Sequence, residues 1–488
     1  MTRIRMPRMQ GRPPHWAGLM VIRLISALKP LSPCPMDVPT VVGGVGTGKA
    51  ATRPTGQPPG NLEPEVLIIQ VMRPRLATAR LQRLAARFPA VAILGARQVG
   101  KSTLLAETVG RNARAFVFDP VMDVANARQD PELFLRLNPP PLILDEVQFV
   151  PELLGPLKRI VDERRSECGQ YFLTGSQQFG LMRGLRESLA GRVGLLELLP
   201  MTQVELYGDL SARPTLTQLL LETSTPEDLF AALSAAPQPA TPPPSLPERV
   251  FRGGMPGLLP FETAEVAEFF ATYLSTYIER DVRTLRDFTA PYEFARFVRL
   301  LAALTARELN ASQLGREIGI SPHTAREWLD VLIQSFQVQR IDAFSTNATK
   351  RVSGRPKLHL VDTGFAAWLA SISSPLALQS HPMFGALFES YVVGELSRQA
   401  TTLATPPQRW HWRSAGGAEV DLLLERDGVF HLIEVKLTSR PSRRDTSGLR
   451  AFAESYPGLR LGHRVVVHGG PDLERLDEVT VAVPVGWV

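Results

Sequence analysis

The stretch VAILGARQVGKST, residues 91–103, decides the fold of a large part of this chain. An apolar run from Val91 to Leu94 enters a loop that begins with a glycine, and TLLAETVGR after the loop reads as a helix. Strand, loop and helix in this order match the pattern G-x-x-x-x-G-K-[ST], in which backbone N–H groups surround a phosphate chain. The positive end of the helix dipole faces that charge. The stretch therefore predicts a phosphate-binding loop; the alternative is a chance glycine-rich turn before a helix.

The same pattern predicts a role for the residues of this loop. Lys101 is expected to reach the β and γ phosphates and to act in catalysis, and Ser102 is expected to hold Mg²⁺. The residues expected to contact the nucleotide here are Gly95, Ala96, Arg97, Gln98, Val99, Gly100, Lys101, Ser102 and Thr103.

A second stretch, PPLILDEVQ at residues 140–148, supplies the acids that such a loop requires. Its apolar strand ends in Asp145 and Glu146, at the edge of an α/β sheet where nucleotide sites lie. Asp145 is expected to take Mg²⁺ through water, and Glu146 is expected to orient or deprotonate the attacking water. An acidic pair after an apolar run is common alone, but its place after the phosphate loop favours a nucleotide site.

Length and composition exclude two classes of protein. A chain of 488 residues exceeds one hydrophobic core, so about three domains are expected. Only Cys34 and Cys168 occur, which argues against a disulfide framework and fits a reducing cytoplasm. No apolar run approaches the roughly 20 residues that span a bilayer, so a membrane partner is not expected.

The positive charge of the chain is concentrated in its first segment. The net charge is +6, but eight basic and three acidic residues precede Met72, so the remainder is close to neutral. Bulk charge therefore gives little support to DNA binding by the folded part. Residues 1–71 are rich in Pro, Gly and Arg and are expected to be a disordered basic tail. Met72 is an alternative start of the native protein, which its mass would test.

Residues 72–210 alternate strands and helices, which predicts a mostly parallel sheet. The strand QYFLTGS ends in residues 174–176, and one of its hydroxyls, such as that of Ser176, could sense the γ phosphate; a plain strand-end turn is the alternative. Arg192 could stabilise transferred-phosphate charge, in cis or across a subunit boundary. The alternative for Arg192 is a helix cap or an ion pair with a surface carboxylate.

Four of these stretches, GARQVGKST, LILDEVQ, FLTGSQQF and ESLAGRVGLLELLP, together resemble a prokaryotic group of AAA-type ATP-binding proteins with an uncharacterised C-terminal domain. FRGGMPGLL, YIERDV and RPKLHLVDTGFAAWL resemble the same group, so the likeness covers residues 72–488. The resemblance implies ATP as the nucleotide, and the expected activity is Mg²⁺-dependent ATP hydrolysis by a protein that could form homo-oligomers.

Residues 211–248 are expected to be a Pro-rich linker, followed by a helical region at residues 249–370. In that region, residues at the end of a first amphipathic helix could face the nucleotide, or form a charged solvated helix end: Tyr277, Glu279, Arg280 and Asp281. Three further helices and a strand over residues 290–344 predict a winged helix-turn-helix. If this unit contacts DNA, His323, Thr324 and Arg326 would face the groove, although one arginine is a poor electrostatic footprint.

Residues 371–488 carry a second acidic signature. HWRSAGGAEVDLLLE and GVFHLIEVKLTS read as strands joined at Asp427 and Gly428, a two-residue hairpin turn. This register places Asp421 opposite Glu434 and Glu419 opposite Lys436, all on one face of the sheet.

Asp421, Glu434 and Lys436, with Glu389 on the preceding helix, resemble the PD-(D/E)xK nuclease fold. The resemblance implies a divalent-metal site held by the acids, with the lysine stabilising charge. The alternative is a cross-strand salt bridge from Glu419 to Lys436 with two hydrogen-bonded acids and no metal.

The expected architecture is an α/β chain with a parallel P-loop NTPase sheet, a winged-helix-like segment and a restriction-endonuclease-like C-terminal domain. The expected function is ATP binding and hydrolysis coupled to the last two parts. Two alternatives stay open: an ATP-dependent nuclease or DNA-processing enzyme, and a non-cleaving switch that binds protein or DNA when loaded with ATP.

Overall fold

The structure is a computed structural model that describes residues 73–110, 113–176, 189–208, 210, 214–237, 242–277, 282, 290–347, 349, 351 and 354–488. All of the described residues belong to one compact unit, Met72–Val488. The expectations for the tail, for Met72 and for Glu279, Arg280 and Asp281 therefore lie outside the described residues.

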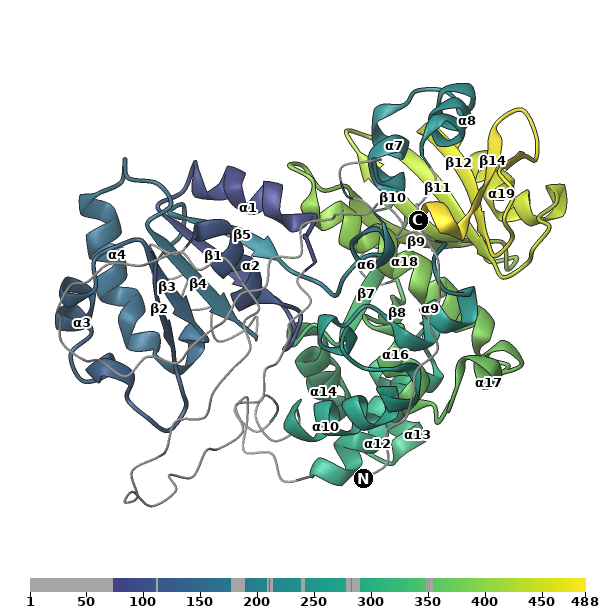
Figure 1. Cartoon of the computed structure of the whole chain (residues 1–488). Coiled ribbons are helices and arrows are strands. Elements are labelled where there is room, and N and C mark those ends of the chain that lie inside the picture. The colour runs from purple at the N-terminus through teal and green to yellow at the C-terminus, as the bar shows by residue number, and fades with distance from the viewer. Residues whose placement is uncertain are drawn as a thin grey trace, which may run out of the picture. The chain divides into compact units, whose positions relative to one another are not determined.

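The first sheet of this unit is a five-stranded parallel sheet in the order β2-β3-β4-β1-β5 (Figure 1). Its strands are β1 (Ala90–Leu94), β2 (Arg114–Val117), β3 (Leu142–Asp145), β4 (Tyr171–Gly175) and β5 (Val193–Glu197). The helices between and before them are α1 (Ala77–Ala85), α2 (Lys101–Val109), α3 (Pro131–Leu137) and α4 (Leu154–Glu163). The expected parallel α/β sheet is confirmed.

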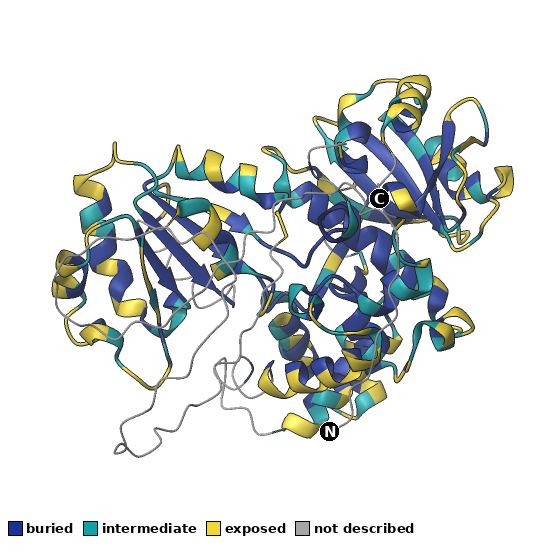
Figure 2. Ribbon diagram, viewed as in Figure 1, coloured by how far each residue is buried: buried dark blue, intermediate teal, exposed yellow. Residues whose placement is uncertain are grey.

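Burial explains why these strands read as apolar runs. Strands β1, β3 and β4 are buried along their whole length, as parallel strands covered on both faces should be. Strand β2 lies at the edge and is mostly exposed. Figure 2 shows the same contrast between buried strands and the exposed outer face of helices such as α3.

The expectation of a linker at residues 211–248 is wrong for most of its length. The segment contains α7 (Leu216–Glu222) and α8 (Pro226–Ala235) and leads into α9 (Leu246–Arg252). Helix α7 is anchored because the Thr217 hydroxyl donates to Gln399 Oε1 at 2.8 Å. Both α7 and α8 begin with capping boxes, which stabilise short helices and were the missed sequence signal.

The expected helices of residues 290–344 are present, after α6 (Gln203–Tyr207) and α10 (Val266–Tyr277). They are α12 (Pro291–Ala303), α13 (Ala311–Ile318) and α14 (Pro322–Gln334). The Ser321 side chain accepts from the Thr324 N–H at 3.0 Å and caps α14, while Gly319 ends α13 with φ of +82°. The short strand β6 (Arg307–Glu308) and strand β7 (Val338–Ala343) both pair antiparallel with β8 (Lys357–Leu360).

The C-terminal elements extend this small sheet to nine strands in the order β13-β14-β12-β11-β10-β9-β7-β8-β6. They are α16 (Thr363–Leu369), α17 (Pro375–Gln379), α18 (Phe384–Thr402), β9 (Gln408–Arg413), β10 (Glu419–Arg426), β11 (Val429–Lys436), α19 (Ser447–Ser455), β12 (Arg460–His468), β13 (Glu474–Arg475) and β14 (Thr480–Pro484). Because β7 pairs with β9, hydrogen bonds cross the boundary expected at residue 370. The hairpin register from Arg426↔Val429 to Leu422↔Ile433 is the expected one.

None of the helices among the described residues combines the length and the apolar character needed to cross a bilayer.

Candidate nucleotide site and carboxylate cluster

The loop between β1 and α2 has the backbone that its glycines predict. A Cβ atom at Gly95 would overlap the backbone oxygen of Leu198, so only glycine fits this close approach. Gly100 has φ of +89°, which favours glycine as well. The buried ammonium of Lys101 donates to the backbone oxygens of Gly95 at 3.0 Å and Ala96 at 2.9 Å. The Lys101 side chain therefore folds back onto the loop and hydrogen-bonds its backbone.

The structure brings the expected Mg²⁺ ligands together. Ser102 Oγ donates to Asp145 Oδ2 at 2.6 Å, and Asp145 is buried at the carboxyl end of β3. The other carboxylate oxygen of Asp145 accepts from the hydroxyl of Thr174 on β4, the strand between β1 and β3. A hydroxyl and a carboxylate are hard oxygen donors, which is the set that Mg²⁺ prefers, so these residues fit the metal.

Glu146 follows directly in a left-handed backbone conformation with φ of +56°. Its N–H donates to Thr174 Oγ1 at 3.1 Å, and its side chain accepts from Gln148 Nε2 at 2.5 Å. Gln148 also donates to Ser176 Oγ at 3.3 Å. Thr174 thus holds the backbone of Glu146, and Gln148, which also contacts Ser176, holds its side chain.

The expected cis role of Arg192 is wrong. Arg192 precedes β5, whose first residue lies beside Ala90 at the amino end of β1, whereas the phosphate loop follows the carboxyl end of β1. The strand of five residues between them spans about 17 Å. Arg192 instead makes a two-pronged ion pair with Asp162, with a distance of 3.0 Å for its Nη2 contact. The alternative of a surface ion pair describes this arginine.

Replacing Arg192 by Ala should therefore leave the rate of ATP hydrolysis within about twofold and leave stability close to that of wild type, because surface ion pairs contribute little. Steady-state ATPase assays over a range of protein concentrations measure this. A loss of tenfold or more that appears only when subunits associate would show that Arg192 acts across a subunit boundary.

Arg75 braces the phosphate loop and was missed by sequence reasoning. Its guanidinium donates to the backbone oxygens of Val99 at 2.7 Å and Leu199 at 2.8 Å, and to Glu205 at 3.0 Å. Only 8% of the Arg75 side chain is exposed. The planar guanidinium carries five N–H donors and can satisfy three such acceptors at once. Arg75 therefore joins the loop to the start of α6.

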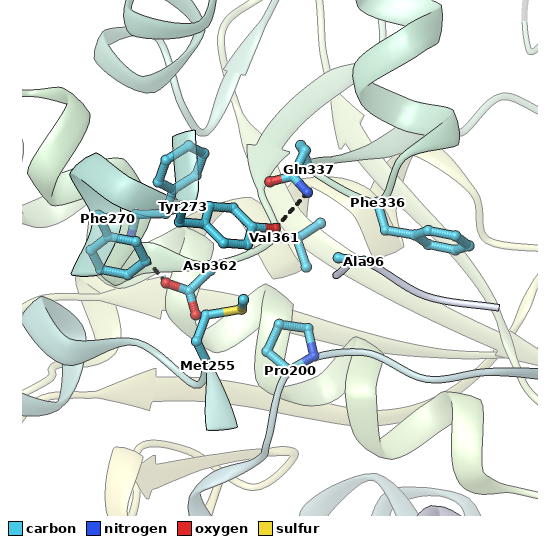
Figure 3. Close-up of a pocket in the computed structure, with 10 residues that line it drawn as sticks. Ala96, Pro200, Met255, Phe270, Tyr273, Phe336, Gln337, Val361 and Asp362 are labelled. Atoms are coloured by element: carbon cyan, nitrogen blue, oxygen red, sulfur yellow. Dashed lines mark hydrogen bonds between the residues drawn. The ribbon is translucent and has the colours of Figure 1, made fainter. Parts of the chain in front are cut away.

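Ala96 of the loop shares a small cavity with residues from the helical region. Its other lining residues are Pro200, Met255, Phe270, Tyr273, Phe336, Gln337, Val361, Asp362 and Phe365 (Figure 3). The cavity has a volume of about 10 Å³, which admits one water molecule at most. Within it Gln337 Nε2 donates to the Tyr273 hydroxyl at 2.9 Å. The cavity therefore lies where the loop packs against the helical region, and it is too small for a nucleotide.

Tyr277, expected to face the nucleotide or end a solvated helix, does neither. It is 1% exposed, and its hydroxyl hydrogen-bonds Ser335 Oγ at 2.6 Å. On α14 the residues expected to face DNA are accessible: His323 and Arg326 are exposed and Thr324 is half-buried. His323 lies 3.6 Å from Glu327, so an acid shares this surface.

Acids from α18 and β10 surround a lysine that the sequence reasoning did not select. Lys357 on β8 donates to Glu389 at 2.8 Å, to Glu419 at 2.5 Å and to Asp421 at 3.0 Å. Burial acts to lower the pKa of Lys357, but the three carboxylates raise it above its ordinary value. The ammonium is therefore charged and fully partnered. We call these four residues the Lys357 cluster.

Glu434 and Lys436 form a separate contact beside the Lys357 cluster. Lys436 Nζ donates to Glu434 Oε1 at 2.6 Å, so the expected alternative of a bridge from Glu419 to Lys436 is wrong. Burial and the charge of Asp421 raise the pKa of Glu434 to about 8. The expected metal site at Asp421 and Glu434 is not formed, because within the described ranges no three acidic, His or Cys side chains are arranged to hold a metal.

His359, two residues beyond Lys357, makes stability depend on pH. Burial, reinforced by the charge of Lys357, lowers its pKa to about 3, while Asp421 opposes the shift. Since the unfolded imidazole titrates near 6.5, the unfolded chain binds more protons below that pH, and the folded state loses stability as the pH falls toward 3.

Acidification from pH 7 to pH 5 should therefore cost about 2 kcal/mol of unfolding free energy through His359 alone. His359→Gln should flatten this part of the profile, because the glutamine stays neutral and can still meet the Ser390 hydroxyl that contacts Nδ1 at 3.0 Å. Urea titrations at both pH values measure the difference. An equal pH dependence in wild type and variant would contradict the assignment.

Comparisons with known proteins agree with the first sheet. Residues 87–207 match an AAA domain family, which supports the expected AAA-type domain in this part of the chain. Residues 243–376 match a domain of unknown function (DUF8612), and residues 384–488 match another (DUF4143). The chain is also similar to the uncharacterized protein Rv2008c of Mycobacterium tuberculosis and to Mb2031c of Mycobacterium bovis. Each is 29% identical over 471 residues, which cover 94% of this chain and 95% of the relative.

Solved structures show weaker likeness. The Thermotoga maritima RuvB Holliday junction branch migration motor is 13% identical, with 58% of this chain and 96% of that chain covered and a TM-score of 0.26. A DNA replication initiation factor is 14% identical, with coverage of 54% and 92% and a TM-score of 0.20. Both TM-scores are too low to support a conclusion about function or assembly.

Proposed function

We propose that this protein hydrolyses ATP with Mg²⁺ and that its nucleotide state acts on a winged-helix unit and a nuclease-like C-terminal domain. The contact of Ser102 with Asp145, at the foot of the helix that begins with Lys101, carries the proposal. It joins the hydroxyl of the phosphate loop to the acid of a different strand, which is the pairing that a metal-bound triphosphate needs.

The residues of this site divide the work. Mg²⁺, when bound with ATP, neutralises charge on the β and γ phosphates. Ser102 and Asp145 would hold it, and Lys101 would exchange its two backbone acceptors for phosphate oxygens. Glu146 would orient or deprotonate water, and Thr174 and Ser176 would fix its position. The N–H groups at the start of α2 would bind the phosphates.

Two chains of contacts support coupling from the loop to the remainder of the protein. Ala96 packs in the cavity lined by Phe336 and Val361, which flank β7 and β8. In the second chain, Arg75 hydrogen-bonds both the phosphate loop and Glu205 on α6. At the start of the same helix, the N–H of Gln203 donates to Glu395 on α18 at 3.0 Å. Glu395 in turn accepts from Arg398 at 2.6 Å. A rearrangement of the loop around phosphate would therefore be transmitted through Arg75 and α6 to α18.

Hydrogen exchange tests this coupling. ATP with Mg²⁺ should change exchange by at least about twofold in backbone amides of α6 and α18, in wild type but not in Lys101→Ala. Helix α4 is the internal control, because its described contacts do not belong to the chain from Arg75 to Glu395. Changes confined to the phosphate loop would contradict the coupling and leave ATP binding intact.

For the winged-helix unit, the order α12, β6, α13, α14, β7, β8, with β8 between β6 and β7, supports the proposal. DNA is a partner that this unit could bind through His323, Thr324 and Arg326. Titration of labelled duplex DNA with and without ATP tests it; an affinity unchanged in Arg326→Ala would exclude the exposed end of α14 as the contact.

Of the two alternatives for the C-terminal domain, the contacts of Lys357 favour the non-cleaving switch. A nuclease needs its acids free for a divalent metal, whereas here an ammonium already satisfies three of them. Plasmid incubated with the purified protein and Mn²⁺, with and without ATP, should stay uncut. Cutting that is lost in Glu434→Ala would establish the ATP-dependent nuclease instead. A cytoplasmic protein that could form homo-oligomers remains part of the proposal.

A further inference from the structure

The centre of the Lys357 cluster is built for one cation. The Lys357 ammonium is 2% exposed and has three N–H bonds, and three carboxylates lie within hydrogen-bond distance of it. These acids come from different elements: Glu389 from α18, and Glu419 and Asp421 from β10. Side chains from three segments of the chain therefore converge on a single point occupied by nitrogen.

A second observation, at Glu434 beside the Lys357 cluster, points to unused binding capacity. Oε2 of Glu434 is buried and has no hydrogen-bond partner among the residues that the structure describes. Lys436 engages only the other oxygen of this carboxylate. Asp421 uses its second oxygen to accept the Val435 N–H at 2.9 Å, so Asp421 and Glu434 are neighbours on adjacent strands. A buried acceptor without a donor is costly, and it marks a place where a ligand can be added.

We propose that the ammonium of Lys357 is the resident cation of this cluster, in the position that a divalent metal would otherwise take. The native protein then binds no metal at these acids, and removal of the ammonium converts them into a divalent-cation site. The ligands of that site would be Glu389, Glu419 and Asp421, completed by Glu434.

Charge and ligand chemistry support the substitution. Glu389, Glu419 and Asp421 share the ammonium of Lys357, and Glu419 also lies 3.7 Å from Arg413, so loss of Lys357 leaves an excess of negative charge in a largely buried place. Such an excess is strongly unfavourable unless a cation enters or protons bind. Mg²⁺ and Mn²⁺ prefer carboxylate oxygens, and the distances of 2.5 to 3.0 Å around Nζ need only a modest contraction to reach metal–oxygen lengths of about 2.1 Å.

The resident lysine also has a consequence for the architecture. A metal held by these acids would join α18, β10 and β11, whereas Lys357 belongs to β8 and ties that strand to α18 and β10. The cation is thus covalently part of the helical region that precedes the C-terminal domain. The inference rests on these contacts alone and does not require ATP hydrolysis.

Mn²⁺ binding to nucleotide-free protein, followed by electron paramagnetic resonance, tests the inference. Lys357→Ala should bind one Mn²⁺ more than wild type, with at least tenfold higher affinity than any weak background site. The double variant Lys357→Ala with Glu419→Gln should lose it. Lys436→Ala is the matched control, because it removes an ammonium from the same face without opening the centre, and it should gain no Mn²⁺.

Thermal unfolding keeps the test informative if Lys357→Ala folds poorly. Without metal its midpoint should fall by about 10 °C, and millimolar Mn²⁺ should restore at least half of the loss while leaving wild type unchanged. Wild type is tested separately by comparison with Glu419→Gln. A Mn²⁺ site in wild type that Glu419→Gln removes would overturn the proposal, and so would a folded Lys357→Ala protein that gains no Mn²⁺.

Discussion

Replacement of Glu146 by Gln should lower the steady-state rate of ATP hydrolysis by at least about 100-fold while ATP affinity stays within about threefold of wild type. The amide cannot take a proton from water, but it keeps the shape of the acid. The contact with Gln148 can also persist. The new amide N–H of residue 146 would donate to the side-chain oxygen of Gln148 once the Gln148 amide has flipped, so the loop need not rearrange. Phosphate release and equilibrium ATP binding measure the two quantities separately.

Glu152→Gln is the matched control for this experiment. Glu152 is exposed in the same segment and lies outside the residues that hold the phosphate loop, so its replacement should leave turnover unchanged. Near-normal hydrolysis by Glu146→Gln would show that another group activates water. Loss of ATP binding together with turnover would mean that Glu146 supports the loop and does not act on water.

Lys101→Ala should weaken ATP binding by at least about 100-fold, which is about 2.7 kcal/mol. The ammonium is buried against the loop and is the charged group placed to meet the β and γ phosphates. Isothermal titration with ATP and Mg²⁺ measures the loss, and circular dichroism checks that the variant is folded.

Lys158→Ala serves as the control, because Lys158 is a half-buried lysine on α4 whose removal changes the net charge equally. If Lys101→Ala binds ATP as wild type does, the loop is not the nucleotide site. If both variants lose affinity alike, the effect is one of overall charge.

The nucleotide site could be predicted from the sequence because its signal is local. Strand, loop and helix follow one another within residues 91–109, and the apolar strand before Asp145 is equally compact. Parallel pairing then requires the ends of β1 and β3 to lie at one edge, so Ser102 and Asp145 meet without further information. The hairpin register of β10 and β11 followed from its turn in the same way.

The remaining residues depend on contacts that no local pattern records. Lys357 meets acids 32, 62 and 64 residues away, and Arg75 meets Glu205 across 130 residues. Arg192 was misplaced because its stretch shows a loop before a strand but not which edge of the sheet that loop occupies. Only the helices α7 and α8 had a readable signal, in the capping boxes that begin at Thr215 and Thr225.

A structure of the Glu146→Gln protein with ATP and Mg²⁺ tests the central claim most directly. It should show the phosphates held by the N–H groups of residues 96–102, the Lys101 ammonium on the β and γ phosphates, and Mg²⁺ between Ser102 and Asp145. A nucleotide bound elsewhere, or a loop that stays closed on Lys101 at saturating ATP, would contradict it.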